Sequence, residues 1–183
     1  MAKFAVIDTE TNWADQVMSI GCCIADADTF ALCDARYYIL PAECQIGGMY
    51  ESTLYIETPV KPILCARGEA MRDLEAWFTQ HGIQAIFAYN ACFDRNHLPE
   101  LRHYTWYDIM RLAAYRQTNP RIPDSAECCS TGRLKRGYGV EAMLRLLSRD
   151  KAYHESHNAF FDALDELSIM KLLDHALGDY IPL

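Results

Sequence analysis

The sequence contains no run of about 18 or more apolar residues, the length a helix needs to cross a bilayer. It also lacks a basic segment followed by an apolar one at its N-terminus, so we expect no signal peptide. Low-complexity segments and internal repeats are absent as well. With 51% hydrophobic residues among 183, the chain is expected to form a single cytoplasmic domain over residues 1–183, with no membrane segment.

None of the eight cysteines is spaced as Cys-x-x-Cys, so the spacing typical of zinc sites is missing. We expect reduced thiols in a reducing compartment, several of them buried as small apolar side chains. Cys128 and Cys129 are adjacent in a Ser/Thr/Gly-rich segment. A redox or metal-binding role stays an alternative for that pair alone.

An excess of basic residues is also lacking, because 17 Lys and Arg face 25 Asp and Glu and the net charge is −8. General nucleic-acid binders are usually basic. Residues 111–136 depart from this balance, and their basic members are Arg111, Arg116, Arg121, Arg133, Lys135 and Arg136. Two interpretations stand: Arg133, Lys135 and Arg136 contact a phosphate backbone, or the segment is a solvated loop of mixed charge.

Acidic residues are placed where a fold can bring four of them together: Asp8, Glu10, Asp94 and Asp162. Asp8 and Glu10 follow the apolar run 4–7, which predicts a buried strand. Because side chains alternate along a strand, both acids point to the same side. Two carboxylates facing one way at a strand end suit hard cations such as Mg²⁺ or Mn²⁺.

The C-terminal segment 157–176 predicts an amphipathic helix, and its apolar stripe comprises Ala163, Leu167, Met170 and Leu173. Asp162 lies at the edge of that stripe, and His157 is expected in the first turn. The positive end of the helix dipole disfavours protonation of His157, and a neutral imidazole is what a general base needs near neutral pH. His154 is the alternative base. Asp165 and Glu166 are expected on the solvated face, and either replaces Asp162 as a ligand if the helix register differs.

Three motifs in this order resemble the DEDD-type 3′–5′ exonucleases of the DnaQ-like group, in the subgroup with a catalytic histidine (DEDDh). That family belongs to the RNase H-like superfamily. The matching segments are Asp8-Thr9-Glu10, Asn90-Ala91-Cys92-Phe93-Asp94 and His157 to Asp162. The resemblance spans residues 4–174 and implies one DEDDh exonuclease domain.

The resemblance implies a two-metal mechanism with Mg²⁺ or Mn²⁺, in which Asp8 bridges both ions. Glu10 and Asp162 would hold the ion beside the attacking water, Asp94 would reach the other through water, and His157 would take the proton. The implied activity is 3′–5′ hydrolysis of single-stranded DNA or RNA, releasing 5′-mononucleotides. The alternatives are a non-catalytic module that binds a nucleic-acid end or a partner, and a proofreading subunit of a DNA polymerase.

Substrate contacts are expected from Thr9 in the first motif and from two further segments. Asn90 either contacts the terminal nucleotide or caps the following turn. Met49 and Tyr50, between two prolines, either stack against a base or pack their loop on the sheet. The His-Gly-Ile signature of many relatives is absent. The acidic net charge suits short or single-stranded 3′ ends, with a partner protein supplying additional grip.

The pattern of elements predicts an α/β fold with a mixed five-stranded, RNase H-like sheet. The strands are expected at 3–9, 17–26, 30–39, 83–88 and 104–107, the first three forming an antiparallel meander. Helices are expected on both faces, at 69–81, within 90–98 after a turn, at 108–115, at 140–147 and at 157–176. Asp108 is expected to cap the third of these helices.

Overall fold

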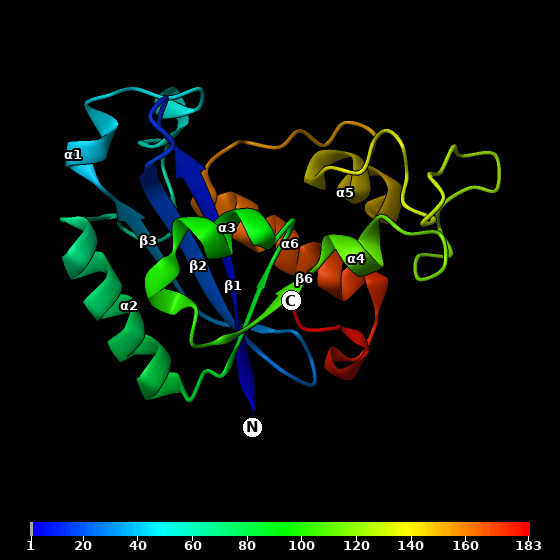
Figure 1. Cartoon of the computed structure of the whole chain (residues 1–183), viewed down its shortest axis with the longest axis horizontal. Helices are drawn as coiled ribbons and strands as arrows, with labels where there is room; N and C mark the ends of the chain where they lie inside the picture. The colour runs from blue at the N-terminus through cyan, green and yellow to red at the C-terminus, as the bar shows by residue number, and fades with distance from the viewer. Residues whose placement is uncertain (1) are drawn as a thin grey trace.

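A six-stranded mixed sheet forms the centre of the computed structural model, which describes residues 2–183 (Figure 1). The strands are β1 (Lys3–Thr11), β2 (Val17–Asp26), β3 (Leu32–Ile39), β4 (Ile63–Leu64), β5 (Ala85–Ala88) and β6 (Thr105–Asp108). Their order across the sheet is β4-β3-β2-β1-β5-β6. The β1–β2 and β2–β3 pairs are antiparallel, whereas β3–β4, β1–β5 and β5–β6 are parallel.

The predicted α/β class, with its antiparallel meander, is confirmed, and the sheet has one strand more than expected. The addition is β4, where Ile63 pairs with Tyr38 and Leu64 with Ile39. Two residues are too few for a period-2 pattern to emerge, and both side chains are exposed. The sequence pattern therefore offered no sign of this edge strand.

Helices cover both faces of the sheet, as the sequence predicted. They are α1 (Pro41–Cys44), α2 (Arg67–His81), α3 (Cys92–His97), α4 (Met110–Ala113), α5 (Val140–Ser148) and α6 (Ala159–Leu173). Three 3₁₀ turns complete the set: η1 (Glu51–Thr53), η2 (Pro99–Leu101) and η3 (Leu177–Asp179). Within residues 2–183 no helix has both the length and the apolar character that crossing a membrane requires.

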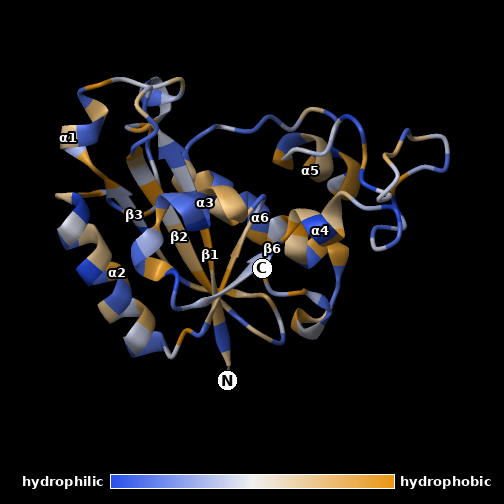
Figure 2. Ribbon diagram, in the orientation of Figure 1, coloured by the Kyte–Doolittle hydropathy of each residue, from blue (hydrophilic) through white to orange (hydrophobic). Residues whose placement is uncertain are grey.

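Alternation along β1 explains why there is a core on each face. Ala5 and Ile7 pack in the core with α2, while Phe4 and Val6 pack in the core with α4, α5 and α6. Both strands β1 and β2 are buried along nearly their whole length, and Figure 2 shows the apolar residues concentrated in these central strands. The sheet is thus the middle layer of three.

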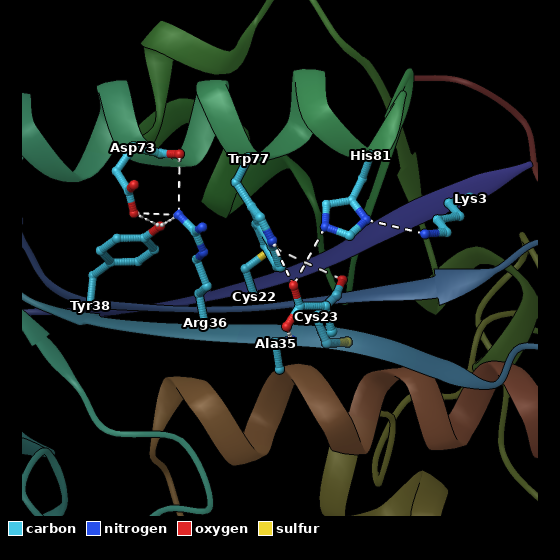
Figure 3. Close-up of polar contacts among 10 residues, drawn as sticks. Lys3, Cys22, Cys23, Ala35, Arg36, Tyr38, Asp73, Trp77 and His81 are labelled. Atoms are coloured by element: carbon cyan, nitrogen blue, oxygen red, sulfur yellow. Dashed lines mark hydrogen bonds and ion pairs between the residues drawn. The ribbon is translucent and has the colours of Figure 1, made fainter.

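Polar contacts attach α2 to the outer strand β3 (Figure 3). The indole nitrogen of Trp77 donates to Asp34 Oδ2 at 2.9 Å, and the Arg36 guanidinium lies 4.8 Å from the centre of the Trp77 ring. The Tyr38 hydroxyl donates to Asp73 Oδ2 at 2.8 Å, and Arg36 forms an ion pair with Asp73. These contacts fix the helix on the face opposite α6.

Two predicted helices are shorter than expected. The predicted 157–176 helix is α6, which begins at Ala159 because Asn158 is its N-cap and accepts a hydrogen bond from Phe160 N at 3.1 Å. His157 therefore precedes the helix instead of lying in its first turn. The predicted 108–115 helix is the short α4, which begins after Asp108, the last residue of β6.

The first turn of α6 lies directly on the backbone of β2. A Cβ atom placed on Gly21 would lie 1.9 Å from the carbonyl oxygen of Ala159, so only glycine fits without a displacement. Gly21 is paired with Asp8 across the β1–β2 ladder. This close approach consequently brings the start of α6 beside the acidic end of β1.

Substituting Gly21 with Ala is expected to destabilise the protein, because the added methyl group meets backbone that cannot rotate away. Overpacking costs about 1–3 kcal/mol, and we expect the upper part of that range. Urea denaturation measures the loss. The matched control is Gly178→Ala, where a Cβ meets no atom within 4 Å. Equal unfolding midpoints for the two variants would contradict the close approach.

Candidate metal centre

An open cavity of about 430 Å³ at one end of the sheet is lined by all four carboxylates of the predicted motifs and by His157. Asp8 and Glu10 come from β1, Asp94 from the first turn of α3, and Asp162 from the first turn of α6. His157 comes from the segment that precedes α6. The fold thus brings together residues that lie up to 154 positions apart in the sequence, from Asp8 to Asp162.

The positions of the acids follow from strand pairing and from local hydrogen bonds. β5 runs parallel to β1, so the chain that leaves β5 enters α3 beside the end of β1. Thr9 Oγ1 donates to Asp94 Oδ1 at 2.8 Å, which fixes α3 against β1. Thr9, expected at the substrate, is buried and bonded to Asp94 as well as lining the cavity.

Glu10, His157 and Asp162 form a group suited to hold a metal ion, because their ligand atoms all lie within 4.8 Å of one another. Two buried carboxylate oxygens, Asp8 Oδ2 and Asp162 Oδ1, have no hydrogen-bond partner in the described residues. Buried polar atoms are normally paired, and carboxylate oxygens are preferred ligands of Mg²⁺ and Mn²⁺. The donor set therefore fits divalent cations.

Burial raises the pKa of each of these acids above its ordinary value. It raises the pKa of Glu10 to about 8, that of Asp94 to about 7 and that of Asp162 to about 9. The pKa of Asp8 is also well above its ordinary value, through burial first and then through repulsion from Asp94. No Lys or Arg among residues 2–183 lines the cavity. The charge of this cluster can therefore be neutralised by protons or by bound cations.

Two further acids near the cavity were missed by sequence reasoning. Glu155 lines the cavity, and burial raises its pKa; its position two residues before His157 was the available signal. Glu166, expected on a solvated face, is instead only 1% exposed, and its Oε2 has no partner in residues 2–183. Residues four apart share a helix face, so Glu166 follows Asp162 inward. The neighbouring Asp165 is half-buried and accepts from the Tyr153 hydroxyl.

Exposed apolar side chains surround the mouth of the cavity. Met49 is 65% exposed and lines the cavity together with Tyr50, as do Trp13 and Phe93, which the sequence analysis did not single out. Trp13 follows the first motif closely, and Phe93 lies within the second. Closeness to these motifs in the sequence could have identified both residues.

Asn90 and Asp108 lie at the junction between β5, β6 and α3. Asn90 is exposed at the cavity with a left-handed backbone (φ 61°), and α3 begins without a side-chain cap, so Asn90 does not cap it. Asp108 Oδ1 accepts from Asn90 N at 2.9 Å and from Met110 N at 3.0 Å. The N-cap of α4 is Ile109 and not Asp108 as expected, but the bond from Met110 N lets Asp108 order the start of α4, and the bond from Asn90 N orders the turn after β5.

The predicted basic contacts Arg133, Lys135 and Arg136 do not line the cavity. They lie in the excursion of residues 114–139 between α4 and α5, which projects away from the sheet at the right of Figure 1. The Arg133 guanidinium lies 4.6 Å from the centre of the Tyr138 ring, and Lys135 lies 4.0 Å from Glu127. Spacing along the chain could not reveal where this excursion points.

The surroundings of His154 and His157 distinguish the two candidate bases, and those of the cysteines show whether they are bonded. His154 lies 3.5 Å from Glu141 and outside the cavity, whereas His157 lines it. All eight cysteines are free thiols. Cys129 Sγ lies 3.0 Å from the carbonyl oxygen of Arg133 within the excursion.

The raised pKa values predict how the metal-free protein responds to pH. In the unfolded protein, carboxyl groups ionise at about pH 4. In the folded protein, the pKa values of Asp94, Glu10 and Asp162 are about 7, 8 and 9. Between these limits the folded state binds more protons than the unfolded state. The free energy of unfolding contributed by these groups therefore falls as pH rises.

We expect urea denaturation in EDTA to show this fall, and the Asp162→Asn variant to show a shallower one. Excess Mg²⁺ or Mn²⁺ should remove the fall, because the ions bind the ionised carboxylates of the folded state. Asp150→Asn, at an exposed position, is the control and should follow the wild type. A wild-type stability that rises between about pH 5 and 8 in EDTA would contradict the assignment.

No protein-family model matches the chain, and no curated protein matches it in sequence. Its structure is similar to that of Escherichia coli exonuclease I bound to a dT13 oligonucleotide, with a TM-score of 0.60 and 15% identity over 98% of this chain and 42% of that one. Exonuclease I from Methylocaldum szegediense has a TM-score of 0.58 and 16% identity over 94% of this chain and 40% of that one. The chain thus spans about two fifths of the length of these exonucleases.

A 3′-exonuclease that recognises the histone mRNA stem-loop is also similar, with a TM-score of 0.62 and 11% identity over 99% of this chain and 70% of that one. The resemblance found in three short motifs therefore extends to the three-dimensional structure of nearly the whole chain. The chain has the RNase H-like fold of these exonucleases.

Proposed function

We propose that this protein is a single-domain, metal-dependent 3′–5′ exonuclease that hydrolyses the terminal phosphodiester of single-stranded nucleic acid. The observation that carries the proposal is the convergence of Asp8, Glu10, Asp94, Asp162 and His157 on one cavity. Unpartnered buried carboxylates are unfavourable without cations. A module that only binds nucleic acid has no chemical need for them.

The carboxylates would hold two ions, with Asp8 shared, Glu10 and Asp162 on the side of the attacking water, and Asp94 on the other side. When bound, the ions supply an acidified water and stabilise the charge that develops on the phosphate and the leaving oxygen. His157 accepts a proton from the attacking water as a general base. The water oxygen bonds to phosphorus, and the bond between phosphorus and the 3′ oxygen of the penultimate nucleotide breaks. The terminal nucleotide leaves as a 5′-mononucleotide.

An unpaired 3′ end suits the mouth of this cavity. Trp13, Met49 and Phe93 are exposed there, and base stacking on aromatic side chains is worth about 1–3 kcal/mol per base. Asn90, exposed at the cavity, would contact the terminal nucleotide. The exonuclease I structures with dT13 and dA16, and the 3′-exonuclease that recognises an mRNA stem-loop, support DNA or RNA as the substrate class.

Additional grip on the strand would come from outside the cavity, because the cavity carries no Lys or Arg among residues 2–183. Arg133, Lys135 and Arg136 on the excursion would hold the phosphate backbone, and a partner protein would add to that grip. One neighbouring structure is a complex of exonuclease I with SSB-Ct. The eight free thiols support a reducing, cytoplasmic setting.

A 5′-labelled oligonucleotide tests the activity. In Mg²⁺ or Mn²⁺ it should shorten in single-nucleotide steps, and Asp8→Ala should abolish the shortening because the shared ligand is lost. The Asp8→Ala protein should unfold in EDTA at the same or a higher temperature than the wild type, since repulsion among the acids is relieved. Asp124→Ala, at an exposed position, is the control. Release of the intact label as the first product would exclude 3′–5′ polarity.

Substituting His157 with Ala should lower the single-turnover rate by about 10²–10⁴-fold at saturating metal, the usual contribution of a positioned base. His154→Ala should leave the rate unchanged, because His154 lies outside the cavity. The pH dependence of the rate that a general base confers should be lost in His157→Ala. A large loss in His154→Ala instead would reassign the base.

A further inference from the structure

Tyr50, the N-cap of η1, and Thr53 within it both contact His157. The Tyr50 ring stacks on the imidazole with 4.1 Å between ring centres and 17° between ring planes. Thr53 Oγ1 donates to the carbonyl oxygen of His157 and also lies 2.7 Å from the carbonyl oxygen of Tyr50. One short segment therefore holds both the side chain and the backbone of His157.

His157 needs such support because its backbone is left-handed, with φ at 52°. This conformation is uncommon for residues other than glycine and persists where the surroundings enforce it. Asn158, fully buried, donates to Thr53 O at 2.8 Å and to the Tyr37 hydroxyl at 2.9 Å. The Tyr37 hydroxyl in turn donates to Leu54 O at 2.8 Å. These bonds join residues 50–54 and 157–158 into one unit.

The side chain of His157 has no hydrogen bond to a protein group within residues 2–183, although its nitrogen lies within 4.8 Å of ligand atoms of Glu10 and Asp162. General bases are commonly oriented by a third group that bonds to the ring. Here the flat contact with Tyr50 takes that place. A stacked ring restricts how the imidazole can tilt and leaves its edge free to face the acids.

We propose that Tyr50 is a positioning residue, which holds the His157 imidazole by stacking in the orientation that proton transfer requires. The proposal rests on the proposed function, because it assumes that His157 is the base. The proposal gives Tyr50 a role different from that of the neighbouring Met49, whose exposed side chain is free to meet the substrate.

Single-turnover rates of four variants test the proposal. Tyr50→Ala should lower the rate by roughly 10- to 100-fold, since small misplacements of reacting groups are costly, while the oligonucleotide dissociation constant stays unchanged. Tyr50→Phe should keep the wild-type rate, because stacking needs the ring and not the hydroxyl. Tyr50→Leu, which keeps the bulk without the ring, should resemble Tyr50→Ala. In a His157→Ala background, Tyr50→Ala should cause no further loss.

An equal loss from Tyr50→Ala in both backgrounds, accompanied by weaker oligonucleotide binding, would overturn the proposal and make Tyr50 a base-stacking residue. A readout without activity separates this outcome from failure of the proposed function. Ring-current shifts of the His157 ring protons, measured by NMR, should be present in the wild type and Tyr50→Phe and lost in Tyr50→Ala. Unchanged shifts would overturn the contact itself. Intact shifts in a protein that hydrolyses nothing would overturn the function of the site.

Discussion

The contact between Gly21 and the first turn of α6 is the constraint on which the site depends. It brings a helix terminus onto the middle of a strand, next to the residue paired with Asp8. Asp162 is then carried to the acidic end of β1, while Asn158 can reach Thr53 and Tyr37. A side chain at position 21 would push the start of α6 away from β2. Asp162 would then move away from Asp8, although neither acid had been substituted.

A second constraint is electrostatic, because the same packing buries acids that repel one another. Burial and repulsion raise the pKa values of Asp8, Glu10, Asp94 and Asp162, and no basic side chain in residues 2–183 lines the cavity to oppose this. Ionising these acids in the metal-free site is therefore electrostatically unfavourable. Divalent cations bound by these acids would relieve that cost by replacing protons, and the affinity for metal would then be linked to the stability of the fold.

Periodicity and motif order were sufficient to predict the sheet, its meander and the residues that meet in the cavity. They succeeded because Asp8 and Glu10 lie two residues apart near the end of the buried strand β1 and because Asp162 lies in a strongly apolar helix. They failed where tertiary contacts decide. The two-residue β4 forms only beside β3, Glu166 turns inward because α6 is buried on that face, and the left-handed His157 is held by a segment about a hundred residues away.

The excursion of residues 114–139 is closed at its neck by hydrogen bonds from Leu134 N to Ala114 O at 2.9 Å and from Arg116 N to Gly132 O at 3.1 Å. Residues 117–131 therefore project from one point of the scaffold as a closed loop, while Arg133 lies at the neck, paired with Tyr115, and Lys135 and Arg136 directly follow it. Segments tethered in this way tolerate exchange in length and composition without disturbing the elements they connect. Under the proposed function, the cavity and this excursion would be separable modules, so a change in the loop would alter the grip on nucleic acid without altering the chemistry of the cavity.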